Sequence, residues 1–449
     1  MRKKNKFLKF SILLILISIF IRSFFLHPTF SDESFYFNVA KNLLEGKNLY
    51  KELFFAHPPL QVYLLAFIFK IFGATFLVAK MLPLVASSAS ALMLYFIMEK
   101  LGDKKAGFIA CAFFLLTPAF LAFSLIENGV WESILFFLLS IYFILKNKLF
   151  LSSLFFLFSS LFRYFSLFYF PFLILLVYLK NQNVLRFLLY FFSLFSISFF
   201  SFISIFGKEY ISQTIFYHFL KFGVFEPLSS QYWQFGYFTF FLCLISALIS
   251  FERKEKLLFL FSLTPLTVDS ILLILLKVKF YHYFLLSLPF CILASAKIWK
   301  DTNRKIVKII IPTIILISIF SNLNTLDFYL NPVHARKFYE IVYFVERYTA
   351  ENETIFGEPV ATNYASFVLG RKISNYYLDS YLSHLRFEGE EKIIEDLKRE
   401  TPKVFIEMKL EEKYYFLSNS HFQNFLRGYR IEKVVEGLPT YLLMVKYLD

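Results

Sequence analysis

The chain has 449 residues, of which 58% are hydrophobic and 21% aromatic, and this apolar share excludes an ordinary soluble domain. The formal charge of +14 would suit nucleic acid, but its distribution argues against that partner. Residues 322–449 hold 16 basic and 19 acidic side chains, whereas residues 1–321 hold 31 and 14. The composition therefore predicts a polytopic membrane protein whose positive charge belongs to its membrane part.

Short basic clusters separate the apolar runs of the membrane part and mark the cytoplasmic side, because cytoplasmic loops carry excess Lys and Arg. A span needs roughly 20 apolar residues, and threading the runs between the clusters predicts about eleven transmembrane helices. The N-terminus is then cytoplasmic, the tail lies outside, and the protein is expected in the cell membrane. The predicted spans lie at about residues 10–26, 81–98, 106–125, 134–145, two within 149–179, 184–206, 235–251, 257–276, 283–298 and 307–320.

The first outer loop, residues 27–80, contains two apolar stretches that we do not expect to span. Residues 58–73 offer only about 14 apolar positions between Pro-Pro and a glycine, and a span there would place every later basic cluster on the wrong side. Residues 34–44 have apolar side chains on one helical face, and Gly46 supplies a stop. The sequence therefore predicts two helices lying along the outer interface.

After about residue 322 the pattern changes to short β-branched segments alternating with helix-period segments. This alternation is typical of a small α/β domain. We therefore predict a mainly α membrane domain over residues 1–321 and an extracytoplasmic α/β domain over residues 322–449. The three cysteines lie in apolar runs without metal-ligand spacing, so neither a disulfide framework nor a zinc site is indicated.

Two acidic turns are predicted on the outer side. Asp32 and Glu33, in "SDES", follow the first span directly, where partial desolvation raises carboxylate basicity. Asp32 is equally a good helix N-cap, so the pair can also be read as capping alone. Glu127 and Glu132, in "IENGVWE", form the second turn and can be read as solvated turn residues. Asp269 lies inside a predicted span, without an evident partner.

Several basic groups are predicted on the same side. They are His57 before Pro58-Pro59, Arg163 at the turn of a short hairpin, and Lys277, Lys279 and His282 at the mouth of a span. Singly, Arg163 would snorkel to the interface and "KVKFYH" would anchor a helix end. Together with the acidic turns they suit a phosphate that carries a lipid tail. Because no Walker loop, Rossmann fingerprint, HExxH or nucleophile elbow is present, the substrate must arrive already activated, as a polyprenyl-phosphate sugar does.

The first outer loop also resembles a known pattern. "SDESFYFNVAKNLLEGKNLY…HPPLQVYLLAFIFKIFG" is similar to that of the GT-C membrane glycosyltransferases, in particular the dolichyl-phosphate-mannose protein mannosyltransferase family and its relative, the lipid A aminoarabinose transferase. The similarity continues through residues 73–120 and at "KFYHYFLLSLPFCIL". It implies a GT-C fold and transfer of a sugar from a polyprenyl-phosphate donor to a hydroxyl of a protein, lipid or glycan acceptor, with inversion.

The resemblance also implies roles for particular residues. Asp32 is expected to be the general base, with Glu33 orienting it or sharing the task. The lipid phosphate is expected to contact His57, Arg163 and Tyr283, beside the cluster residues Lys279 and His282. Glu127 or Glu132 stands near the family's second acidic position. No cofactor is required; a divalent ion on Asp32 and Glu33 is left open, as are the sugar and the acceptor.

Two other classes of function are compatible with the sequence. A transporter or flippase of a lipid-linked or anionic substrate would show Gly- or Pro-broken spans in inverted repeats, and no such pair is evident. A non-catalytic subunit whose outer domain binds glycans would keep its partner's activity after both Asp32 and Glu33 are changed.

Overall fold

The structure is a computed structural model that describes residues 6–220, 230–275, 281–374, 389–410, 413–437 and 439–446. The chain forms two compact units. Unit 1 comprises residues 1–26, 81–202 and 223–330, and unit 2 comprises residues 27–80, 203–222 and 331–449. The first outer loop and the C-terminal segment, far apart in sequence, therefore belong to the same compact unit.

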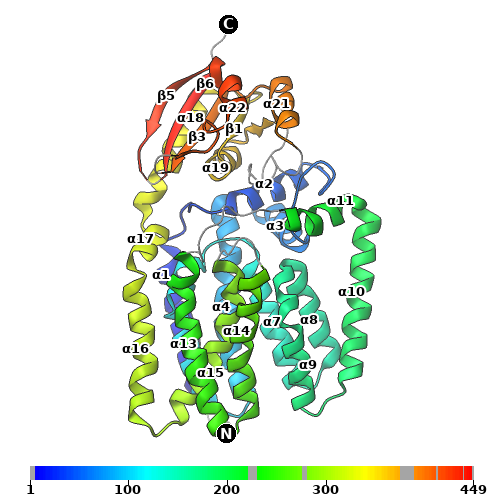
Figure 1. The fold of residues 1–449 in the computed structure, drawn as a ribbon, viewed down its shortest axis with the longest axis vertical. Helices are drawn as coiled ribbons and strands as arrows, with labels where there is room; N and C mark the ends of the chain where they lie inside the picture. Colours follow the sequence, from blue (N-terminus) through cyan, green and yellow to red (C-terminus); the bar gives the residue numbers. More distant parts are fainter. Residues whose placement is uncertain are drawn as a thin grey trace. The chain divides into compact units, whose positions relative to one another are not determined.

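Unit 1 is helical, and its long helices run side by side in Figure 1. Its elements are α1 (Lys6–Ser23), most of α4 (Phe76–Lys100), α5 (Lys104–Leu115), α6 (Pro118–Phe123), α7 (Val130–Leu145), α8 (Leu149–Phe162), η1 (Tyr164–Tyr169), α9 (Phe170–Leu179), most of α10 (Val184–Phe206), α13 (Ser230–Glu252), α14 (Lys256–Leu275), η3 (Tyr281–Ser287), α15 (Leu288–Asp301), α16 (Lys305–Ser321) and α17 (Leu323–Leu330).

Four helical stretches among the described residues are long and apolar enough to cross a membrane, and the bent pair α16 and α17 makes a fifth candidate. The four are α4, α10, α14 and the stretch His282–Asp301; several shorter apolar helices accompany them. By length and composition the chain is therefore a multi-pass membrane protein, and the count of about eleven spans stays a prediction.

Helix packing in unit 1 follows the chemistry of membrane interiors, where small polar residues let helices approach closely. Ser140 of α7 and Ser152 of α8 lie 3.0 Å apart between their hydroxyl oxygens, and Ser246 of α13 and Ser295 of α15 lie 3.1 Å apart. By contrast α10 turns most of its apolar side chains outward; Phe200 is 67% exposed. Such an exposed apolar helix face suits contact with lipid.

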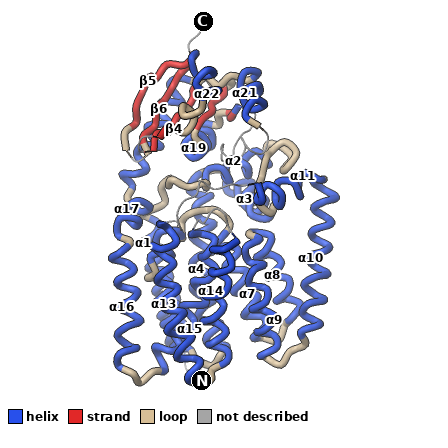
Figure 2. Tube along the Cα trace, in the orientation of Figure 1, coloured by secondary structure: helices blue, strands red, loops and turns tan. Residues whose placement is uncertain are grey.

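Unit 2 combines helices with one sheet, as Figure 2 shows. Its helices are α2 (Glu33–Leu44), α3 (Leu60–Phe72), α11 (Lys208–Ile211), η2 (Ser212–Phe216), α12 (Tyr217–Leu220), η4 (Pro332–Ala335), α18 (Arg336–Tyr348), α19 (Pro359–Leu369), α21 (Glu390–Arg399), α22 (Ser420–Phe425) and η6 (Leu426–Gly428). Its strands are β1 (Thr354–Gly357), β2 (Lys372–Ile373), β3 (Val404–Leu410), β4 (Lys413–Tyr414), β5 (Tyr429–Val435) and β6 (Thr440–Lys446).

The sheet has the strand order β2-β1-β3-β6-β5, with β4 paired to β3. Strands β2, β1 and β3 are parallel, whereas β6 is antiparallel to both β3 and β5. Strands β5 and β6 therefore form a hairpin, whereas the parallel strands β1 and β2 are joined by the crossover helix α19. The predicted mainly α protein with a small C-terminal α/β domain is confirmed.

The outer-loop helices and the short hairpin also form as expected. Helices α2 and α3 match the two predicted interfacial segments, and α8 ends at Phe162, directly before Arg163. The predicted span at residues 106–125 is instead broken between α5 and α6. Thr117 caps the second piece and Pro118 occupies its first turn, a pattern that starts a new helix.

Candidate functional site

The two carboxylates of the first acidic turn have different environments. Asp32 occupies the N-cap position of α2, but its side chain makes no capping hydrogen bond, and the residue is exposed. Glu33 begins the helix and is completely buried. The structure therefore does not support the interpretation of this pair as helix capping alone.

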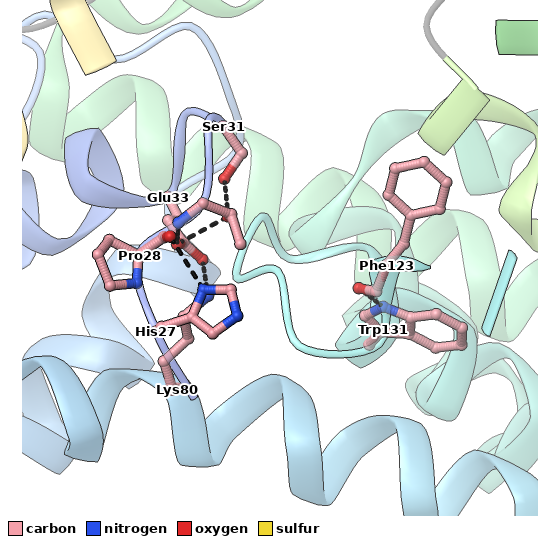
Figure 3. Close-up of polar contacts among 8 residues, drawn as sticks. His27, Pro28, Ser31, Glu33, Lys80, Phe123 and Trp131 are labelled. Carbon is pink, nitrogen blue, oxygen red and sulfur yellow. Dashed lines mark hydrogen bonds and ion pairs between the residues drawn. The ribbon is translucent and has the colours of Figure 1, made fainter. Parts of the chain in front are cut away.

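Glu33 is held by a lysine 47 positions away. Lys80 Nζ lies 2.6 Å from Glu33 Oε2, and both side chains are fully inaccessible to solvent. Glu33 Oε1 accepts from the backbone N–H of Thr29 at 3.2 Å and from its hydroxyl at 3.0 Å. Figure 3 shows Lys80 reaching the carboxylate beneath the turn that begins at His27. Glu33 thus fixes the shape of the turn, and Asp32 is the carboxylate presented outward.

His57 lies against the same end of α2. Its ring is 6.0 Å from that of Tyr36, one turn beyond Glu33, and 5.6 Å from the ring of His218. The backbone here is fixed by side chains: Tyr50 donates to the carbonyl of His57 at 2.7 Å. Unit 2 therefore places His57 beside Tyr36 of α2 and beside His218, and its role at the lipid phosphate stays a prediction.

The C-terminal segment contributes two buried ionisable groups next to the first turn. Lys337 of α18 places its ammonium 5.8 Å from the ring of Phe30 and 5.9 Å from that of Tyr441. Glu358 caps α19, accepting from the N–H groups of residues 360 and 361 at 3.1 and 2.8 Å.

Both groups have displaced pKa values. Burial lowers the pKa of Lys337 to about 8, although Glu358 favours its charged form. Burial raises the pKa of Glu358 to about 7 against the effect of its capping bonds, and the charge of Asp32 adds to the rise. The C-terminal segment therefore places ionisable groups within electrostatic reach of Asp32.

The second acidic turn lies in unit 1, and its charged residues are buried. Glu127, Glu132 and Arg163 are exposed by 0, 2 and 3%. An Nη2 hydrogen of Arg163 is donated to the carbonyl oxygen of Asn128, and the arginine charge acts on Glu132. Arg163 is therefore brought to this turn, and neither glutamate is the solvated residue that the alternative interpretation requires.

Tyr283 and His282 belong to the same region of unit 1. The Tyr283 ring lies 4.3 Å from that of Phe165, two residues after Arg163, and 4.4 Å from the His282 ring. Lys277 and Lys279 fall outside the described residues. Asp269 gains a partner that the sequence did not suggest: Ser287 donates to it, and Tyr169 lies 2.6 Å from that serine hydroxyl.

Among the residues that the structure describes, no group of three or more His, Cys, Asp and Glu is arranged to hold a metal ion. A divalent ion on Asp32 and Glu33 stays a prediction. To reach such an ion, Glu33 would have to give up contacts to Lys80 and Thr29.

Four residues near the first turn were missed by sequence reasoning: Lys80, His218, Lys337 and Glu358. For Lys80 a signal existed, because a lysine at the mouth of a long apolar run needs a buried counter-charge or a route to the interface. The others lie in ordinary-looking segments. Only the fold brings them near α2.

No family model and no curated protein matches this sequence. Solved structures do. ArnT from Cupriavidus metallidurans, in the apo state, aligns with a TM-score of 0.65 at 10% identity, over 97% of each chain; the same protein bound to undecaprenyl phosphate aligns with a TM-score of 0.65 at 9% identity, over 98% of each.

The Archaeoglobus fulgidus oligosaccharyltransferase tethered to an acceptor peptide aligns with a TM-score of 0.52 at 13% identity, over 90% of this chain and 69% of that one. ArnT and this oligosaccharyltransferase share the GT-C fold. The chain therefore has a GT-C fold, as predicted.

Proposed function

We propose that this protein is a membrane glycosyltransferase that moves a sugar from a polyprenyl-phosphate donor to an acceptor hydroxyl at the outer face of the membrane. The observation that carries the proposal is the difference between the two carboxylates of the first acidic turn. Glu33 is buried and paired with Lys80, whereas Asp32 is exposed. The fold supports it, because the similar structures include ArnT bound to undecaprenyl phosphate and an oligosaccharyltransferase with dolichol-phosphate.

Asp32 acts as the general base in this proposal. It takes the proton of the acceptor hydroxyl as the oxygen attacks the anomeric carbon. The bond from that carbon to the phosphate oxygen breaks, and its electron pair leaves with the phosphate. Attack opposite the leaving group inverts the anomeric centre. Because phosphate leaves as a stable anion, no acid is needed to protonate it, unlike in a two-carboxylate glycosidase.

Basic groups stabilise the negative charge that develops on the leaving phosphate. His57 beside α2 is one candidate, and Arg163, His282 and Tyr283 of unit 1 are others, with Lys279 assigned from the sequence alone. The sugar and the acceptor, whether protein, lipid or glycan, are not assigned. The proposed orientation has the N-terminus in the cytoplasm and the C-terminal domain outside.

Replacing Asp32 by Asn tests the base directly. General-base catalysis contributes about 10²–10⁴-fold, so turnover of a polyprenyl-phosphate sugar should fall by that factor while binding of the donor lipid is kept. Glu346→Gln is a matched control, because Glu346 is an exposed carboxylate of the same unit.

Mass spectrometry of lipids that copurify with both variants reports donor binding independently of turnover. Wild-type turnover in Asp32→Asn would contradict the role of Asp32 as general base. Transport of a lipid-linked substrate without any sugar transfer would favour the flippase over the enzyme.

A further inference from the structure

Helices α2 and α19 lie side by side in unit 2 and run in the same direction. At their N-terminal ends Asp32 acts electrostatically on Glu358. Midway, the buried Asn38 amide donates to the backbone and side-chain oxygens of Asn363 at 2.8 and 2.9 Å. Near their C-terminal ends Lys41 Nζ lies 3.4 Å from the carbonyl oxygen of residue 367. The two helices thus form a continuous seam that starts at Asp32.

A cavity of about 180 Å³ opens at the far end of this seam. Three residues of α2 at helical spacing and its C-cap residue line one side, and the end of α19 with the start of β2 lines the other. The lining side chains that the argument uses are Asn38, Lys41, Asn42, Glu45, Ser366 and Arg371. Seven of the nine lining residues have polar side chains, and Ile373 supplies one apolar side chain, so the cavity suits a mainly hydrophilic ligand.

Hydrogen bonds hold several of the residues that line the cavity. Its floor is the buried Asn38, whose oxygen lies 3.5 Å from the Ser366 hydroxyl, and that hydroxyl donates to the carbonyl of Arg371 at 2.6 Å. Arg371 is anchored by two hydrogen bonds of 3.0 Å from Nε and Nη2 to Thr349. A guanidinium held in this way keeps its remaining N–H groups in fixed directions.

Positive charge prevails at the cavity. The lining contains the cations Lys41 and Arg371 and a single carboxylate, that of Glu45. A third cation of the lining, Lys372, is paired with Glu400. Gly370 ends α19 with a φ of +71°, and a Cβ built there would lie 3.6 Å from Lys41 Nζ. That distance is an ordinary van der Waals contact, so glycine is favoured here by its left-handed φ and not by the space beside Lys41.

We propose that this cavity binds an anionic group, phosphate or carboxylate, on the acceptor of the transfer reaction, which rests on the function proposed above. From Asp32 to Lys41 the helical rise of 1.5 Å per residue gives about 14 Å. An acceptor that spans this distance would have its hydroxyl at Asp32 and its anion at Lys41 and Arg371. Remote contacts of this kind hold the reacting hydroxyl in place.

The test uses glucose 6-phosphate and glucose as probes and measures the dissociation constant by isothermal titration on the detergent-solubilised full chain. The wild type should bind the phosphorylated sugar and not glucose. Lys41→Met keeps the side-chain stem and should weaken binding about tenfold or more, because a charge-assisted hydrogen bond is lost. Lys51→Met, at an exposed lysine of the same unit, should leave binding unchanged.

A second variant covers the case in which Lys41→Met does not fold. Asn42→Asp keeps the side-chain size and adds a negative charge to the lining, so it should also weaken binding of glucose 6-phosphate. Equal binding by wild type, Lys41→Met and Asn42→Asp, or none by wild type, would overturn the proposal. Asp32→Asn separates the two proposals, since it should abolish transfer and still bind the probe.

Discussion

The two acidic turns solve the problem of a carboxylate near the membrane in different ways. In the turn at residues 27–33 of unit 2, one glutamate is neutralised by a lysine bonded at 2.6 Å, and the neighbouring aspartate stays exposed. In the turn at residues 124–132 of unit 1, Glu127 and Glu132 are both buried, and Arg163 bonds the backbone between them.

The difference bears on which carboxylate can serve as the proposed general base. A general base must meet the proton of an incoming hydroxyl, so it has to be accessible and held at a fixed position. The first turn meets both conditions, because a buried ion pair anchors the backbone next to an outward-facing carboxylate. The second turn keeps its carboxylates away from water and suits the support of a cation or of the helix hairpin around it.

The largest effect on this comparison should come from Lys80→Met. It leaves the charge of Glu33 buried without its lysine, and breaking a buried pair on one side costs about 3–5 kcal/mol. Denaturant unfolding of the detergent-solubilised protein measures that loss. The double variant Lys80→Met, Glu33→Gln should recover part of it, because the uncompensated charge is then gone. A loss below about 1 kcal/mol would mean that the pair does not anchor the turn.

Glu358 gives the first turn a pH dependence. Its pKa of about 7 in the folded protein exceeds the ordinary value of 4.5, so the folded state holds its proton more tightly than the unfolded state does. Its contribution to stability is therefore complete below pH 4.5 and is lost as the pH rises through 7, by up to about 3 kcal/mol. Glu358→Gln keeps a capping oxygen and should raise Tm at pH 8 but not at pH 4.5.

The pKa of Lys337 is displaced in the opposite direction, so this residue serves as a control. Its pKa is lowered to about 8, so its contribution is present at high pH and lost as the pH falls through 8. Lys337→Met should therefore change the Tm difference between pH 8 and 10.5, whereas Glu358→Gln changes it between pH 4.5 and 7. Identical pH profiles for wild type and Glu358→Gln would contradict the assignment.

Sequence reasoning predicted the elements that depend on local pattern. The apolar run at residues 184–206 forms α10, and the stretch 149–179, which is long enough for two short spans, breaks before Arg163. The resemblance implied different roles for Asp32 and Glu33, but the sequence could not predict which of the two is buried. Which of two adjacent carboxylates is buried depends on the face of α2 that packs, and that face is set by Lys80 and by α19, 325 residues away at the Asn38 contact.

Arg163→Gln tests the second turn. Loss of a hydrogen bond from a charged group costs about 1.5–3 kcal/mol, and the effect should appear in both stability and turnover. Adding Glu132→Gln removes the carboxylate on which the arginine acts, so the part of the loss that comes from the uncompensated charge should recover. Turnover should stay low if Arg163 stabilises the donor phosphate. Recovery of both would assign Arg163 to charge compensation alone.

The last comparison uses one buried hydrogen bond in each turn. The Thr29 hydroxyl donates to Glu33 at 3.0 Å, and Trp131 Nε1 donates to the carbonyl of residue 123 at 2.7 Å, as Figure 3 shows for the tryptophan. Thr29→Val removes a bond to a charged acceptor and should cost about 1.5–3 kcal/mol. Trp131→Phe should cost a similar amount, because the loss of a neutral bond adds to the space that the smaller ring leaves in the core.

Similar losses of stability make the two variants comparable in turnover. Because the Thr29 bond shapes the backbone beside the proposed base, Thr29→Val should lower kcat several-fold with little change in KM for the donor. Trp131→Phe keeps its ring among Phe114 and Phe120 and should leave kcat near the wild-type value. The reverse pattern, with kcat sensitive to Trp131 and not to Thr29, would move the reacting centre to the second turn.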